Sequence, residues 1–190
     1  MNWFQSVDWG IFLFFNGIHT PWLDVFFYYV SHRFFWIPLY LVVLFFLLKR
    51  YKEKSFIIIF LLILTILFSD QTCNLIKIKA QRLRPSHQIE LVSKVHLIDY
   101  PGGKVYKGGK YGFPSSHAAN SSAFALFVIL FLARKKRWII YPSIAWVILI
   151  SYSRIYLGVH YPSDILAGYL VGTGWALFFG LGYLNFRKKK

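Results

Sequence analysis

Three polar groups, far apart along the chain, carry side chains of the types that bind phosphate and transfer phosphoryl groups. They are Lys77-Ile-Lys-Ala-Gln-Arg-Leu-Arg84-Pro85, then Pro114-Ser115-Ser116-His117, then the stretch Ser153–Asp164 with Arg154 and His160. Arginine forms paired hydrogen bonds with phosphate oxygens, and lysine adds a point charge. Two histidines stand in the same set, and one of them has a carboxylate four residues later. The set therefore indicates chemistry on a phosphoryl group.

The spacing within these groups suits metal-free phosphoryl transfer through a phosphohistidine. Lys77 and Arg84 are seven residues apart, which is two helical turns, so they share one helix face. Ser115 precedes an apolar run, and the free N–H groups at a helix start bind phosphate. A carboxylate beside a histidine orients one ring nitrogen and leaves the other free as a nucleophile or base, while a second histidine can protonate the leaving oxygen. The cations Lys77, Arg84 and Arg154 would stabilise charge on the phosphoryl oxygens.

The composition places these groups in a membrane protein. Of the 190 residues, 57% are hydrophobic, 21% are aromatic and 15% are charged, and the mean hydropathy is +0.49. Soluble domains carry about a quarter charged residues, so the composition argues against a soluble globule and excludes a disordered or collagen-like chain. Cys73 is the single cysteine, which excludes an intrachain disulfide and cysteine-based metal sites. The length fits one domain over residues 1–190.

Long apolar runs predict an all-α, polytopic transmembrane helix bundle of five to six spans. A spanning helix needs about 20 residues. The runs lie at about 30–49, 55–82, 116–133, 138–157 and 163–184. Residues 1–30 are expected to form interfacial helices, and the first of these is expected to be amphipathic or re-entrant. Residues 85–113, with their glycines, prolines and lysines, are expected to form an extracytoplasmic loop.

The distribution of charge predicts the topology. The net charge is +15, and basic blocks at 49–54, 134–137 and 187–190 cap the ends of apolar runs. By the positive-inside rule these blocks face the cytoplasm. The three polar groups then meet on the opposite, periplasmic face of a bacterial inner membrane. The charge also favours anionic lipids over nucleic acid as partners.

Taken together, the three groups resemble the tripartite signature of the type 2 phosphatidic acid phosphatase family, which also includes glucose-6-phosphatase-like and vanadium haloperoxidase proteins. The matching pattern is K-x6-RP, then P-S-x-H, then S-R-x5-H-x3-D, and it spans residues 77–164. Ser116 departs from the family pattern, which usually has glycine there. Its small side chain still permits close approach of the backbone.

The resemblance implies a role for each matching residue. His160 is expected to be the nucleophile, Asp164 its partner that fixes the tautomer, and His117 the general acid and later the base for water. The phosphate-binding residues that the resemblance implies are Lys77, Arg84, Ser115, Ser116 and Arg154. The family needs no metal ion and no other cofactor for this reaction.

The resulting hypothesis is a metal-independent lipid phosphatase that acts on a membrane lipid bearing phosphate or pyrophosphate. Undecaprenyl pyrophosphate is the first expected substrate, followed by lipid A 1-phosphate, phosphatidylglycerol phosphate and phosphatidic acid. Two alternatives stay open: a lipid phosphotransferase with the same site, and a non-enzymatic membrane transporter or scaffold. A vanadium haloperoxidase is disfavoured because such proteins are soluble. Asp70 is either a counter-ion for a site cation or a structural hydrogen-bonding group inside the bundle.

Overall fold

The computed structural model describes residues 3–99, 103–133 and 136–188, and helices dominate these ranges. The helices are α1 (Trp3–Asn16), α2 (Pro21–Ser31), α3 (Ile37–Tyr51), α4 (Ser55–Ala80), α5 (Ser116–Leu132), α6 (Ile140–Tyr156) and α7 (Pro162–Lys188). Within the described ranges, β-pairing is limited to two isolated bridges, Leu83 with Tyr111 and Asp99 with Val105. The predicted all-α fold is confirmed.

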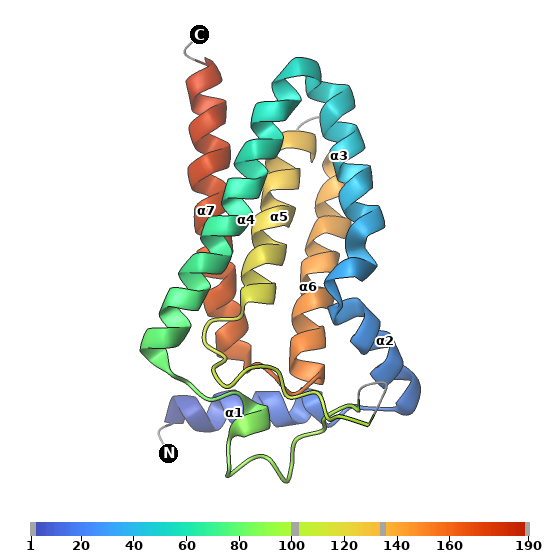
Figure 1. The fold of residues 1–190 in the computed structure, drawn as a ribbon, viewed down its shortest axis with the longest axis vertical. Helices are drawn as coiled ribbons and strands as arrows, with labels where there is room; N and C mark the ends of the chain where they lie inside the picture. The colour runs from blue at the N-terminus through green and yellow to red at the C-terminus, as the bar shows by residue number, and fades with distance from the viewer. Residues whose placement is uncertain (1–2, 100–102, 134–135, 189–190) are drawn as a thin grey trace.

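Helices α3 to α7 run along the long axis of the molecule, whereas α1 lies across their lower ends (Figure 1). Among the residues that the structure describes, three helical stretches are long and apolar enough to cross a membrane: Arg33–Ala80, Arg137–Tyr156 and Pro162–Lys188. The first contains both α3 and α4, which turn back on each other at Lys52–Lys54, and α5 is a shorter apolar helix. The chain is therefore a multi-pass membrane protein with five bundle helices, as the sequence predicts.

The span predicted at 30–49 begins later than expected. His32 adopts an extended conformation that ends α2, and a short 3-10 turn at Arg33–Trp36 follows. Pro38 then lies in the first turn of α3. Proline suits this position because the N–H group that it lacks would have no partner within the helix. The spanning helix accordingly starts at Ile37 rather than near residue 30.

The close packing of α5 against α7 positions the starts of both helices. Two glycines on α7 make it possible: a Cβ atom at Gly168 would lie 2.5 Å from the Ser115 carbonyl oxygen, and one at Gly172 would lie 2.0 Å from the Ala119 carbonyl oxygen. Only glycine permits this separation. The first turns of α5 and α7, which carry two of the three polar groups, are therefore held against each other.

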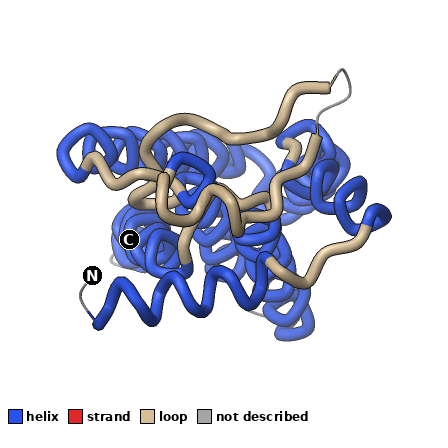
Figure 2. The backbone as a smooth tube through the Cα atoms, turned by 90° about the horizontal axis from the view of Figure 1, so that it is seen from below, coloured by secondary structure: helices blue, strands red, loops and turns tan. Residues whose placement is uncertain are grey.

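Helix α1 is fastened beneath the bundle by a buried asparagine. Asn16 Nδ2 donates to the Tyr156 carbonyl at 2.9 Å and to the Ile155 carbonyl at 3.1 Å, so it caps the end of α6. Its Oδ1 accepts from the His96 N–H at 2.8 Å, which joins the long loop to the same point. Figure 2, seen from below, shows this loop lying over the ends of the bundle helices with α1 along one edge.

The basic blocks lie at the opposite end of the bundle. The α3–α4 turn, the end of α5 and the end of α7 all lie at the top in Figure 1. Arg50 Nη1 donates to the Leu132 carbonyl and the Tyr51 hydroxyl donates to the Phe131 carbonyl, both at 2.8 Å, so α3 is tied to the end of α5. Residues 134–135 and 189–190 of the blocks lie outside the described residues.

Candidate active site

The three polar groups meet at the lower end of the bundle, beside α1 (Figure 1). The Lys77 ammonium, near the end of α4, donates to Ser116 Oγ at the start of α5. Arg84 Nη1, in the loop after α4, lies 3.2 Å from His160 Nε2, in the turn before α7. Arg154, in the last turn of α6, completes the set. Residues up to 83 positions apart, Lys77 and His160, thus converge on one place.

His160 and Asp164 form a buried pair. His160 is 1% exposed and Asp164 is 0% exposed, and 3.4 Å separates His160 Nδ1 from Asp164 Oδ2. The Tyr161 N–H donates to the same carboxylate oxygen at 3.0 Å and helps to fix it. Because the guanidinium of Arg84 can only donate, the Nε2 atom that faces it must be the unprotonated ring nitrogen. Nδ1 therefore carries the proton and donates it toward Asp164.

The surroundings of His160 favour its neutral form. Burial lowers the pKa of His160 well below its ordinary value of 6.5, and the positive charges of Arg84, Arg154 and Lys77 lower it further. Burial and the charge of Arg154 lower the pKa of Arg84 to about 10, so its guanidinium remains charged at neutral pH. The turn thus holds an unprotonated imidazole nitrogen next to a cation.

The three cations of the site have only neutral partners. Arg154 is 2% exposed and donates to Ser31 Oγ and, over 2.7 Å, to the Tyr106 hydroxyl, while its Nε has no hydrogen-bond partner among the described residues. Within the described ranges, none of Lys77, Arg84 and Arg154 forms an ion pair with a carboxylate. Clustered cations that are partly or wholly buried are costly without a counter-ion, so this arrangement favours a bound anion.

The residues at the start of α5 differ in what they contact. Ser115 is fully buried; its Oγ accepts from the Ala118 N–H at 3.4 Å, and its own N–H donates to the Asp164 carbonyl at 2.9 Å. Ser115 therefore caps α5 and joins it to α7. His117 is exposed, and it lies within electrostatic range of Arg154, His160, Arg84 and Lys77. Both imidazoles stand at the same end of the molecule.

A cavity of about 750 Å³ extends from the start of α5 into the bundle. Its polar lining includes Ser31, Ser116 and His117, and its apolar lining includes Ile66, Phe124 and Trp146, among other residues of α3 to α6. Pockets of this kind, mostly apolar with a few convergent polar groups, bind small molecules and cofactors. A ligand with a phosphate at one end and an apolar body fits this distribution of side chains.

Asp70 also lines this cavity, and the structure shows its hydrogen bonds. Its carboxylate accepts from Asn74 Nδ2 at 3.0 Å and from Asn120 Nδ2 at 3.4 Å. Within the described residues it forms no ion pair with a site cation. Of the two roles left open for Asp70, hydrogen bonding inside the bundle is the one observed.

The sequence interpretation missed Arg82 and Asp8. Arg82 Nη1 donates to Asp164 Oδ1 at 2.8 Å, and Arg82 Nη2 donates to Asp8 Oδ2 at 2.5 Å. Asp8 also accepts from the Ser163 hydroxyl at 2.6 Å and from the Ser163 N–H at 3.0 Å. The available signal was the single carboxylate of α1, together with an extra arginine two residues before Arg84. The sequence alone does not indicate that Asp8 and Arg82 contact each other, because they are brought together only when the chain folds.

Gly112 is a third residue near the site that the sequence interpretation did not include. A Cβ atom there would lie 3.1 Å from both Arg84 Cγ and Asp164 Oδ2, and 3.5 Å from His160 Nδ1. The long loop therefore passes close to the His160–Asp164 pair, and a side chain at position 112 would require Arg84 or Asp164 to shift by a few tenths of an ångström.

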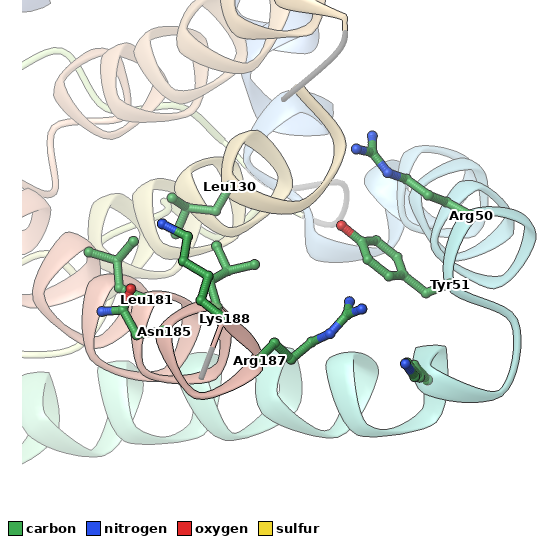
Figure 3. A pocket seen from close by; sticks show the side chains of 9 residues that line it. Arg50, Tyr51, Leu130, Leu181, Asn185, Arg187 and Lys188 are labelled. Atoms are coloured by element: carbon green, nitrogen blue, oxygen red, sulfur yellow. The ribbon is translucent and has the colours of Figure 1, made fainter. Parts of the chain in front are cut away.

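A second basic pocket, at the opposite end of the bundle, lacks the groups that catalysis would need. It measures about 600 Å³, and its lining includes Arg50, Tyr51, Arg187 and Lys188 (Figure 3). Figure 3 shows Arg187 directed toward Tyr51, while Lys188 lies on the side of Leu130. No histidine or carboxylate is among the described residues that line it. It offers cations without a nucleophile, so the candidate active site is the lower one.

Comparison with known proteins shows which family and which relatives this chain resembles. The profile of the PAP2 superfamily matches residues 54–188. The chain is 37% identical over 184 residues to the lipid A 4'-phosphatase of Bacteroides thetaiotaomicron, covering 94% of this chain and 79% of that protein. It is 30% identical over 179 residues to the undecaprenyl-diphosphatase of Sulfolobus acidocaldarius, covering 92% and 78%. Among solved structures, a transmembrane PAP2-type phosphatidylglycerolphosphate phosphatase from Bacillus subtilis superposes with a TM-score of 0.69 at 21% identity, covering 97% of this chain and 88% of that chain. That likeness supports the fold.

Proposed function

The chain belongs to the PAP2 superfamily, as its three motifs predicted, and from this premise we propose that it is a membrane lipid phosphatase acting through a phosphohistidine at His160. The observation that carries the proposal is a buried, neutral imidazole among three cations that have no carboxylate partner within the described part of the chain. The apolar cavity beside this group supports a lipid as the phosphate carrier. The functional unit is one membrane domain over residues 1–190.

The first half of the reaction forms a bond between His160 Nε2 and phosphorus. Lys77, Arg84 and Arg154 bind the non-bridging phosphate oxygens, and Ser116 adds a hydrogen bond beside Lys77. Arg84 exchanges its contact with Nε2 for one with the substrate, which exposes the nitrogen lone pair. The bound phosphate dianion offsets the charge of the three cations, so His117 is protonated in the substrate complex. As the N–P bond forms, the P–O bond to the lipid breaks, and His117 donates this proton to the leaving oxygen. The cations stabilise the charge on the equatorial oxygens.

The second half of the reaction returns the enzyme to its starting state. His117, now neutral, accepts a proton from a water molecule while the water oxygen attacks phosphorus. The N–P bond breaks, and the electron pair returns to His160 Nε2. Asp164 holds the proton on Nδ1 throughout and stabilises the positive charge that the ring carries in the intermediate. Ser115 contributes by holding the starts of α5 and α7 together.

The substrate is proposed to be a phosphomonoester on a lipid A-type glycolipid. This reverses the order reached from the sequence, where undecaprenyl pyrophosphate came first. The relative with 37% identity is a lipid A 4'-phosphatase, whereas the undecaprenyl-diphosphatase is 30% identical. Undecaprenyl pyrophosphate, phosphatidylglycerol phosphate and phosphatidic acid are the next candidates.

The site is proposed to face the periplasm from a bacterial inner membrane. Basic residues near the ends of α3 and α7 lie at the end opposite the site, and such residues favour the cytoplasmic side. A lipid of the outer leaflet would then reach the cavity laterally, between the bundle helices.

The direct test is phosphate release from a panel of purified lipid phosphates by the purified protein in detergent. We expect free phosphate from at least one lipid, inhibition by vanadate, and unchanged rates with a metal chelator. His160→Ala should lower turnover by about 10³-fold or more while the protein stays folded. Label that moves to a second lipid instead of water would indicate a phosphotransferase. A protein with no turnover on any lipid would be a transporter or scaffold.

A further inference from the structure

A carboxylate in the membrane-spanning helix α4 has no place in the mechanism above. Asp70 follows the apolar first half of α4, stands between Ser69 and Gln71, and lines the cavity near His117. Ionisable residues at such positions are costly, and where they persist they mark functional contacts. Two amide groups, from Asn74 and Asn120, hold the Asp70 carboxylate in place.

Asp70 lies deeper in the bundle than the cations do. It precedes Lys77 by seven residues on α4, which places it on the same helix face about 10 Å farther along the axis. On α5, Asn120 follows Ser116 by four residues and likewise shares its face. The Lys77–Ser116 and Asp70–Asn120 hydrogen bonds are thus two successive links between α4 and α5. Ser116, Asp70 and Asn120 all line the same cavity.

The deeper link offers hydrogen-bond acceptors. A carboxylate can accept about four hydrogen bonds, and Asp70 accepts two from the described residues. Asn120 must direct its Nδ2 toward the carboxylate, because a carboxylate only accepts. Asn120 Oδ1 is left buried, without a hydrogen-bond partner among the described residues. A negative charge here repels phosphate and favours a hydroxyl or an amide N–H.

We propose that Asp70 and Asn120 are specificity-determining residues that accept hydrogen bonds from the group carrying the phosphate. With the phosphate on Lys77, Arg84 and Arg154, the carrier extends along the cavity to this pair. The pair selects lipids whose phosphate is attached to a hydroxyl- or amide-bearing carrier, such as an acylated amino sugar. It disfavours polyprenyl diphosphates and diacyl phosphatidic acid, which have no donors there. The inference rests on the proposed lipid phosphatase activity.

The experiment measures kcat/KM for two kinds of lipid on the same preparations. The donor-bearing substrate is lipid A phosphorylated at the 4' position, and the donor-free substrates are phosphatidic acid and undecaprenyl pyrophosphate. Wild-type protein is compared with Asp70→Asn, which keeps the shape and removes the charge, and with Asn120→Ala. Gln71→Ala is the matched control, because Gln71 is exposed on α4 and does not line the cavity.

The readout is the ratio of kcat/KM for the donor-bearing lipid to that for each donor-free lipid. We expect wild type to favour the donor-bearing lipid, Asp70→Asn to lower the ratio about 10-fold or more, and Gln71→Ala to leave it within about two-fold. A wild-type ratio near one would overturn the inference even if the variants do not fold. The inference would also be overturned if Asp70→Asn and Asn120→Ala lowered turnover on every lipid but left this ratio unchanged. Failure of wild type on every lipid would count instead against the phosphatase proposal itself.

Discussion

At the scale of single residues, the protonation state of His160 is the feature on which the proposed chemistry depends. The imidazole is buried, and its unprotonated Nε2 faces a guanidinium. A free histidine is partly protonated near neutral pH. His160 escapes protonation because a positive ring would be added to a site that already holds three cations.

This environment predicts the acid limb of the pH–rate profile. Because the pKa of His160 is lowered well below 6.5, protonation of the nucleophile occurs only at pH values well below 6.5. We expect kcat/KM to show no loss near pH 6.5 that arises from His160. Arg154→Gln removes one positive charge, so the pKa of His160 should rise and the acid limb should move to higher pH. The check is a pH–rate profile of both proteins. An acid limb at the same pH in both would contradict this electrostatic account.

At the scale of elements, the site is made where helix ends are held together. α4 ends at it, α5 and α7 begin at it, and α1 supports it from below. Two sets of contacts fix the positions of these helix ends. The first is the close glycine packing between α5 and α7. The second is the polar link from α1 to α7 through Asp8, Arg82 and Ser163.

The glycine contacts predict a large difference between two otherwise similar substitutions on α7. Gly172→Ala places a Cβ 2.0 Å from the Ala119 carbonyl oxygen, so the helices must separate. Overpacking of this kind costs about 1–3 kcal/mol, and we expect a lower Tm together with reduced turnover. Gly174→Ala is the matched control, since a Cβ there meets no atom within 4 Å. Equal Tm values for the two variants would contradict this account, because they would show that a Cβ at position 172 fits between α5 and α7 without loss of stability.

The polar link predicts that α1 affects catalysis without touching substrate. Asp8 holds Arg82, which in turn holds the Asp164 carboxylate beside His160. We expect Asp8→Asn to lower kcat by about 10- to 100-fold with little change in KM, because misplaced catalytic groups reduce the rate of the chemical step. Arg82→Lys should behave in the same direction. Glu90→Gln, an exposed carboxylate in the loop, is the control. A change in KM alone would assign Asp8 to substrate binding instead.

At the scale of the whole molecule, the sequence predicted the helices better than the boundaries and connections between them. The apolar runs and basic blocks were long enough to predict five to six spans and to separate the two ends of the bundle. The three motifs predicted which residues would converge at one end. The break between α2 and α3 at His32 was not predicted. His32 and Pro38 are also typical of the start of a single helix, so they did not indicate that one helix ends and another begins there.

The partners of the motif residues could not be predicted, for a physical reason. Ser31 and Tyr106 contact Arg154 across 123 and 48 residues, and Asp8 contacts Arg82 across 74 residues. No periodicity connects such positions, because the path of the loop and the placement of α1 decide these contacts. The motif marks the residues proposed to touch phosphate, and the folded chain supplies the groups that hold them.

The topology makes a prediction that labelling can check. Cys73, the single cysteine, is buried, so maleimide labelling of a variant would come from the introduced cysteine. In intact cells with a permeable outer membrane, Lys94→Cys in the long loop should react with a membrane-impermeant maleimide. Lys136→Cys at the opposite end should react only after lysis. The reverse pattern would place the proposed active site on the cytoplasmic face.

The most direct measurement is to identify the phosphorylated residue after rapid quenching with ³²P-labelled lipid phosphate. The proposed mechanism predicts an acid-labile, base-stable phosphohistidine at His160. It should be absent from His160→Ala, and it should persist longer in His117→Ala because water lacks its base. Label on His117, or full phosphate release by His160→Ala, would contradict the central claim that His160 takes the phosphoryl group.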